Sequence, residues 1–256
     1  MTINLLFLIL VGVFVSAAAG YLGSFMVIKR MALVGDALSH VALPGMAIAL
    51  TFNFSPILGA FIALILALIG IWYLEESSQV YTEALVGVFF TASLALGILI
   101  TPEAELLEAL FGNIENITLL EGLVAIFISL VVFAITRLIS QKLILGVISD
   151  ELAKSTGIVM AKINLIYLFL VGTVVALGVK FVGTLLMGAL VIIPAASAKN
   201  IGRSLKSYHR FSILFGILSA ILGISAAEFF QIATGPAVVL TSIIFFIISY
   251  LFKNRF

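Results

Sequence analysis

Long apolar runs separated by short polar segments follow one another along the whole chain. A helix needs about 20 mainly apolar residues to cross a bilayer, because each residue advances it by only about 1.5 Å. Leu5–Ile28 is one such run, and it ends at Lys29-Arg30. The others cover residues 37–52, 57–74, 84–100, 119–139, 164–179, 182–198, 211–227 and 233–252. The pattern predicts an all-α polytopic membrane protein with about nine transmembrane helices, or eight as the alternative.

Two local patterns bear on how these helices pack. In the first run, small residues recur at every fourth position, namely Gly12, Ser16, Gly20 and Ser24. Such a stripe lets another membrane helix approach closely. Only Lys180-Phe181 separate the run 164–179 from the run 182–198. This join is so short that one of the two runs is expected to be a broken or re-entrant helix.

Composition agrees with a membrane protein. The chain is 63% hydrophobic and 10% charged, where a typical soluble domain has about 25% charged residues. Residues 1–256 are therefore expected to form a single transmembrane domain. The first run lacks a positively charged leader, so it is interpreted as a helix and not as a signal peptide. The chain has no cysteine, which excludes thiolate metal sites, and a net charge of +1 gives no indication of a nucleic-acid partner.

The positions of the charges predict an orientation. With the N-terminus outside and alternating spans, only Lys180 among the span-flanking basic residues falls outside, together with the acidic segment 103–116. Membrane proteins concentrate Lys and Arg on the cytoplasmic side. Nine spans, with the N-terminus outside and the C-terminus inside, satisfy this rule. The basic residues at the inner side are Lys29, Arg30, Arg137, Lys142, Lys154, Lys162, Lys199, Arg203, Lys206, Arg210, Lys253 and Arg255.

The second run carries two candidate metal ligands, Asp36 and His40. Residues four apart share one face of a helix, and an ionisable residue inside a membrane span indicates a functional site. His40 lies ten residues beyond Arg30, roughly 15 Å along a helix. Carboxylate and imidazole together suit zinc, manganese or iron as divalent ions. Because one chain offers only two ligands, a symmetric dimer is expected to supply four. The alternative is that Asp36 caps a helix and His40 hydrogen-bonds to a neighbouring backbone.

The longest polar connection runs from Ser140 to Lys162. Within it, Ser149-Asp150-Glu151 is typical of a helix start, and Gly157 of a helix end about two turns later. The chain contains no Gly-x-x-x-x-Gly-Lys-[Ser/Thr] phosphate loop. ATP hydrolysis is therefore expected to need another polypeptide, and this chain is predicted not to be an enzyme.

Two long segments resemble a known family. Met31–Gly45, with Gly-Asp-Ala-Leu-Ser-His followed by Leu-Pro-Gly, is similar to a signature of the membrane-spanning subunits of bacterial ABC importers for zinc, manganese and iron. Residues 182–198 resemble a late helix of that family, and residues 84–99 and 110–113 are similar as well. The resemblance implies a fold like that of the vitamin B12 importer permease and a homodimeric pore in the prokaryotic inner membrane. It also implies two cytoplasmic ATPase subunits, which use the ATP, and a metal-binding protein outside.

The resemblance also implies roles for particular residues. Asp36 and His40 match the family residues that face the pore and contact the transported divalent ion, and the chain itself binds no cofactor. The ATPase-docking coupling helix of the family matches the cytoplasmic loop at about residues 140–163. Its candidate residues here are Asp150, Glu151, Leu152, Ala153, Lys154, Ser155, Thr156 and Gly157.

Two other classes of protein are alternatives to an ABC importer subunit. A proton- or ion-coupled metal carrier could use Asp36, His40 and Glu228 as a relay, but the sequence shows no internal repeat of the kind common in carriers. An intramembrane metalloprotease would need a His-Glu-x-x-His helix, which is absent. Among the remaining polar residues, Glu83 is expected to face the positive end of a helix dipole, and His209 is expected to be solvated in a basic loop.

Overall fold

The computed structural model describes residues 2–78, 80–100 and 117–253, and every regular element in these ranges is an α-helix. The predicted surface segment 103–116 and the similar residues 110–113 lie outside the described ranges. The helices are α1 Thr2–Ile28, α2 Ala32–Thr51, α3 Pro56–Ser77, α4 Thr82–Ile100, α6 Leu119–Ile148, α7 Asp150–Ser155, α8 Met160–Val182, α9 Thr184–Ile201, α10 Leu205–Phe230 and α11 Thr234–Leu251.

The described helices confirm the all-helical membrane fold. Eight of them are long and apolar enough to cross a membrane, and the apolar part of α9, Met187–Ile201, is a shorter addition. Both runs at the tight join are helices, separated by Gly183 with φ +83°. Because glycine adopts positive φ without a steric penalty, the chain can reverse there in one residue.

Two boundaries differ from the prediction. The helix α2 begins at Ala32, before the apolar run 37–52 starts, and continues through Pro44. The helix α6 continues to Ile148 instead of ending near residue 139. Gln141 and Lys142 are exposed, while Ile139 and, one turn later, Leu143 are buried. The helical pattern of buried and exposed residues therefore extends into the segment interpreted as a loop.

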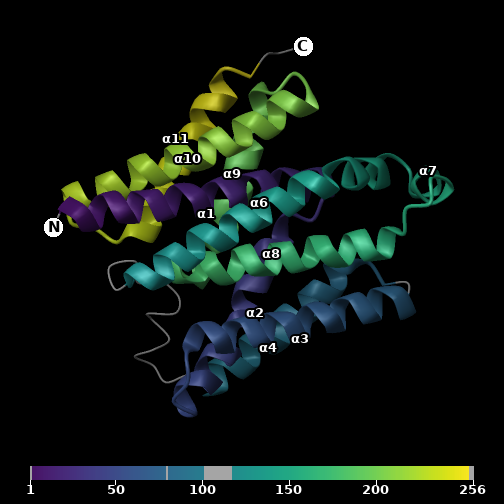
Figure 1. Ribbon diagram of the computed structural model, residues 1–256, viewed down its shortest axis with the longest axis horizontal. Coiled ribbons are helices and arrows are strands. Elements are labelled where there is room, and N and C mark those ends of the chain that lie inside the picture. The colour runs from purple at the N-terminus through teal and green to yellow at the C-terminus, as the bar shows by residue number, and fades with distance from the viewer. Residues whose placement is uncertain (1, 79, 101–116, 254–256) are drawn as a thin grey trace.

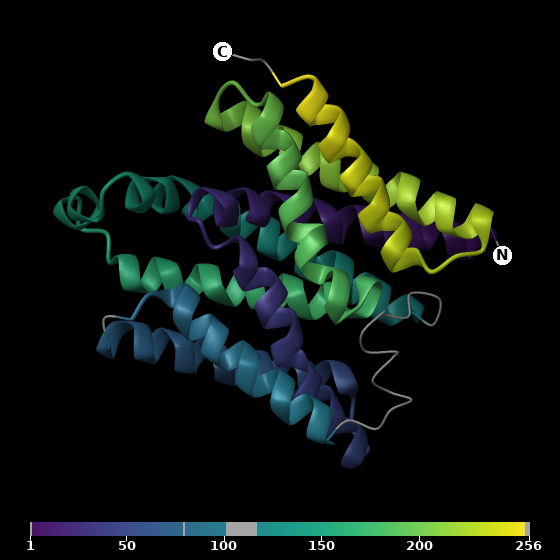
Figure 2. The ribbon, with the colours of Figure 1, turned by 180° about the vertical axis from the view of Figure 1, so that it is seen from behind.

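The long helices lie roughly side by side, and two helices cross them. The N-terminus lies at one side of the molecule and α7 projects from the opposite side (Figures 1 and 2). The helices α1, α6, α8 and α10 run along the direction between these sides, while α2 and α9 cross it obliquely (Figure 2). The helix α2 lies between the pair α3 and α4 and the rest of the bundle (Figure 1).

The small-residue stripe of α1 faces α10, as its spacing predicted. A Cβ atom at Gly20 would lie 2.6 Å from the carbonyl oxygen of Ser212, and one at Gly216 would lie 2.6 Å from the carbonyl oxygen of Ser16. The hydroxyl of Ser212 donates to the carbonyl of Gly20 at 2.5 Å. The two backbones therefore touch directly, because Gly20 and Gly216 have no side chains.

We predict that Gly20→Ala destabilises the protein by about 1–3 kcal/mol, because the new methyl group meets a backbone atom that cannot rotate away. Gly87→Ala on α4 is the matched control, since nothing lies within 4 Å of a Cβ atom there; alanine's better helix propensity should leave it neutral or raise stability by up to about 1 kcal/mol. Thermal unfolding in detergent measures both. Equal midpoints for the two variants would contradict the described α1–α10 contact.

Candidate functional site

The helix α2 holds both predicted ligands in a mostly buried setting. Asp36 is partly buried, and His40, one turn later, is 9% exposed. The two side chains lie on one face of a continuous helix, as the four-residue spacing predicted. Because α2 crosses the long helices obliquely (Figure 2), His40 rises less along their direction than the roughly 15 Å of helix that separates it from Arg30.

The start of α2 excludes the capping role considered for Asp36. The helix begins at Ala32, with Met31 as its N-cap residue and no side-chain cap. Asp36 is the fifth residue of the helix, beyond the turn in which a side chain can satisfy free N–H groups. The interpretation of Asp36 as a cap is therefore wrong.

His40 also lacks the partner that a structural histidine would have. Its Nδ1 atom is buried and has no hydrogen-bond partner among the described residues. The ring meets Phe90 of α4 edge-on, with 5.3 Å between ring centroids. A buried polar atom without a hydrogen-bond partner is costly, so the unpaired Nδ1 of His40 needs an explanation. The interpretation in which His40 bonds to a neighbouring backbone finds no support in the described part of the chain.

Gly188 on α9 makes the space in which Asp36 lies. A Cβ atom at Gly188 would lie 2.5 Å from the Cβ and 2.8 Å from Oδ1 of Asp36. One turn of α9 further on, Val191 lies over Gly23 and Gly35. The two segments that resemble the importer family thus meet at one place. Sequence reasoning singled out both segments but gave Gly188 no role, because spacing along a chain does not show which helices cross.

The donor set suits a loosely held cation. Pro44 has no N–H to offer the carbonyl of His40 four residues earlier, which leaves an additional acceptor on the same helix. No group of three or more His, Cys, Asp or Glu side chains able to hold a metal occurs in the described residues. Among the described residues, the carboxylate of Asp36 and the imidazole of His40 therefore form a pair and not a larger ligand cluster.

The predicted coupling segment forms a capped short helix at the edge of the molecule (Figure 1). The hydroxyl of Ser149 accepts a hydrogen bond from the backbone of Leu152 at 3.1 Å, and Gly157, with φ +78°, ends the segment. Ala153 is fully buried and fixes α7 to the bundle, whereas Leu152 is 47% exposed. Also exposed are the side chains of Glu151, Lys154, Ser155 and Thr156. Both ends of α7 confirm the sequence prediction.

Of the remaining polar residues, Glu83 confirms its prediction, Glu228 is exposed, and His209 differs from its prediction. Glu83 lies in the first turn of α4, as predicted. Glu228 is exposed on α10, which packs against α1, α9 and α11. The prediction for His209 was wrong: its ring stacks on Phe25 at 4.5 Å, and its Nδ1 lies 2.6 Å from the hydroxyl oxygen of Ser24. Ser24 closes the small-residue stripe, and its small side chain leaves room for the imidazole.

Together, these features define a class of protein: a multi-pass α-helical membrane protein with an ionisable pair at the crossing of two central helices, as is typical of ion-transporting subunits. A sequence profile described as the ABC 3 transport family matches residues 2–253. The chain belongs to this family.

Two relatives illustrate its range. The chain is 34% identical over 254 residues to the high-affinity zinc uptake system membrane protein ZnuB of Haemophilus influenzae, covering 96% of each protein. It is 31% identical over 248 residues to the manganese transport system membrane protein MntC of Halalkalibacterium halodurans, covering 95% of this chain and 85% of that protein.

Two solved structures share the fold. A chain of PsaBC from Streptococcus pneumoniae, solved with a Fab, matches with a TM-score of 0.84 at 28% identity, covering 97% of this chain and 91% of that chain. An ABC transporter of metal-chelate type in an inward-facing conformation matches with a TM-score of 0.75 at 22% identity, covering 96% of this chain and 85% of that chain. The second likeness concerns the fold alone.

We predict that Gly188→Ala displaces Asp36, because its methyl group would lie 2.5 Å from the Asp36 Cβ. The chain should still insert, but any metal-dependent activity should fall about tenfold or more, since a ligand displaced by about 1 Å loses its geometry. Metal uptake by cells, normalised to the amount of protein in the membrane, measures this. Gly87→Ala is the control, and equal uptake by the two variants would show that Asp36 is not confined by α9.

Proposed function

We propose that this chain is the membrane-spanning subunit of an ATP-driven importer for a divalent transition-metal ion, zinc, manganese or iron. The observation that carries the proposal is the Asp36–His40 pair, with the buried and unpartnered Nδ1 of His40, in a chain of the ABC 3 transport family. The names of the relatives, which refer to zinc and manganese, support the choice of substrate class.

In the proposed mechanism, two copies of the chain place their α2 helices at a shared pore. Each contributes Asp36 and His40, so that a dehydrated ion meets two carboxylates and two imidazoles. Transition-metal ions of borderline softness accept this mixed set. A transport site must release its ion as well as bind it. A site split between two chains suits both tasks, because a small movement between the subunits changes the number of ligands within reach.

The energy source lies outside this chain. The sequence has no phosphate-binding loop, so we assign ATP hydrolysis to separate cytoplasmic subunits and no enzymatic activity to this chain. The exposed side of α7, with Leu152 at its centre, is the proposed docking surface for the ATPase. We therefore propose that the N-terminus lies outside and the C-terminus inside, with the metal-binding protein at the outer face of the prokaryotic inner membrane. The coupling loop at about residues 140–163 belongs to a single permease domain.

The first test is metal uptake by cells that contain the chain with its cognate ATPase and metal-binding protein. We predict that Asp36→Asn and His40→Gln each reduce uptake about tenfold or more, because each keeps the side chain's approximate size but removes a charged or strongly coordinating ligand. Glu228→Gln should leave uptake unchanged. Uptake that persists in both ligand variants would refute the proposed site.

The same cells distinguish the importer from a secondary carrier. A carrier that uses Asp36, His40 and Glu228 as a relay would lose activity in Glu228→Gln and would need the proton gradient but no ATPase. An importer would instead lose uptake when the ATPase subunit carries an inactive nucleotide site. The exposed position of Glu228 favours the importer.

The docking surface has its own prediction. Leu152→Glu places a charge at the centre of the exposed side of α7 without touching the buried Ala153. It should reduce recovery of the ATPase with the purified chain about tenfold, since apolar anchors in interface centres dominate binding. Leu205→Glu is the control, because Leu205 is also exposed, at 40%, and begins α10. Equal recovery of the ATPase with both variants would contradict docking on α7.

A further inference from the structure

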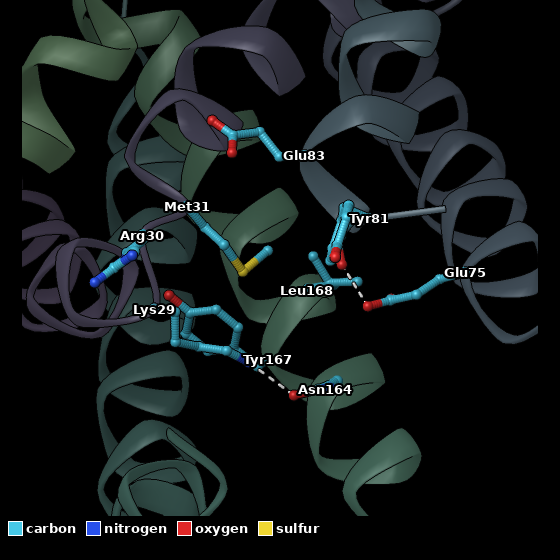
Figure 3. A pocket seen from close by; sticks show the side chains of 10 residues that line it. Lys29, Arg30, Met31, Glu75, Tyr81, Glu83, Asn164, Tyr167 and Leu168 are labelled. Carbon is cyan, nitrogen blue, oxygen red and sulfur yellow. Dashed lines mark hydrogen bonds between the residues drawn. The ribbon is translucent and has the colours of Figure 1, made fainter. Parts of the chain in front are cut away.

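Lys29 joins the corner before α2 to the first turns of α8. Its Nζ donates a hydrogen bond to Oδ1 of Asn164 at 2.7 Å and lies 5.1 Å from the ring centroid of Tyr167 (Figure 3). The Tyr167 hydroxyl in turn donates to the carbonyl of Leu22 on α1 at 3.4 Å. We call Lys29, Asn164 and Tyr167 the α1–α8 latch. It connects segments that are far apart in the sequence.

On the side of α2, the latch acts on a stiff corner. Arg30 has φ +61°, and the backbone N–H of Met31 bonds to the carbonyl of Met26 at 2.9 Å while that of Arg30 bonds to Val27 at 3.3 Å. This pattern is a Schellman motif, which closes a helix end with two backbone hydrogen bonds. The helix α2 begins directly after it. A displacement of Lys29 is therefore passed to the helix that carries Asp36 and His40.

On the side of α7, the path is equally short. Ala153 is fully buried, and its carbonyl accepts from the backbone N–H of Ile158 at 3.0 Å. The helix α8 starts at Met160, whose side chain lies so close to Gly146 of α6 that a Cβ atom there would be 2.1 Å away. Asn164 follows one turn into α8. Only residues 156–159 separate α7 from α8, and the hydrogen bond from Ile158 to Ala153 ties this connection to α7.

Open space lies on both sides of this connection. Asn164 and Glu75 line a cavity of about 300 Å³ together with Lys29, and also a cavity of about 500 Å³ together with Lys154. Figure 3 shows the first cavity, with Asn164 and Lys29 on one side and Glu75 on the other. Close-packed protein interiors resist displacement. Because cavities adjoin the latch, the base of α8 and the α1–α2 corner can move together without compressing a core.

We propose that the α1–α8 latch transmits the movement of α7 to α2 and thereby couples ATP hydrolysis to access at Asp36 and His40. This inference rests on the proposed function. Lys29 acts as a positioning residue: it does not contact the ion, and it holds the corner of α2 to α8. Without the latch, ATP hydrolysis should continue, but access at Asp36 and His40 should no longer change with it.

The test uses the chain with its cognate ATPase and metal-binding protein in proteoliposomes, and measures metal transported per ATP hydrolysed. Lys29→Met and Asn164→Leu should each lower this ratio about tenfold while ATP hydrolysis stays within about twofold. The double variant should be no worse than Lys29→Met alone, because Lys29→Met already removes the contact with Asn164. Lys29→Arg, which keeps a charged donor, should retain most of the coupling. Arg30→Gln is the matched control, because Arg30 lines the same cavity as Lys29.

Three outcomes would overturn the latch. The first is a ratio for Lys29→Met equal to that of Arg30→Gln. The second is a double variant whose loss is the product of the two single losses. The third is ATP hydrolysis and transport falling together, which would indicate general damage. Asp36→Asn in the same vesicles separates the two proposals. Normal transport by Asp36→Asn refutes the proposed function. Impaired transport by Asp36→Asn together with normal coupling in Lys29→Met refutes the latch alone.

Discussion

The structure depends on helices that touch through their backbones at positions without side chains. A Cβ atom at Gly23 would lie 2.0 Å from the carbonyl oxygen of Val191, which joins α1 to α9, and Gly45 and Gly59 make a similar contact between α2 and α3. In a membrane, burial of apolar surface gives helices little reason to associate, because lipid is as apolar as their side chains. Close van der Waals contact and hydrogen bonds such as that from Ser212 to Gly20 must supply the stabilisation.

The same constraint explains how an acidic residue is accommodated. Asp36 lies against Gly188 of α9. Its carboxylate occupies the volume that a larger residue at position 188 would fill. His40 lies beside Phe90 and leaves its Nδ1 without a partner in the described residues. The pair is confined by shape, and no hydrogen bond to another side chain of the described residues holds it in place. This suits a site that exchanges its occupant, since ligands committed to internal partners would first have to be released.

Much of the local structure could be predicted from the sequence. The apolar runs located the helices, the stripe from Gly12 to Ser24 predicted a closely packed face, and Ser149 and Gly157 marked the ends of α7. These features are encoded by residues close together in the chain. The sequence reasoning did not predict the partners across helices: Gly188 for Asp36, Asn164 for Lys29, and Ser24 for His209. His209 illustrates the difference, because its basic neighbours indicated solvent while its own ring faces the stripe of α1. The roles of Asp36, His40 and α7 in transport follow from the proposal and not from the helix positions.

The contact between Asp36 and Gly188 has a consequence for biogenesis. The helix α2 is the second to leave the ribosome, whereas α9 is one of the last three, so most of the chain is synthesised before Asp36 meets its final neighbour. During that interval the nascent protein holds a carboxylate without its final neighbour. Such a residue costs about 2.5–3.5 kcal/mol at the centre of an inserted helix, and less at the position of Asp36, the fifth residue of α2. The Gly45–Gly59 contact gives α2 an early partner in α3. The final packing of α2 is therefore a late event in assembly, completed only when the C-terminal helices arrive.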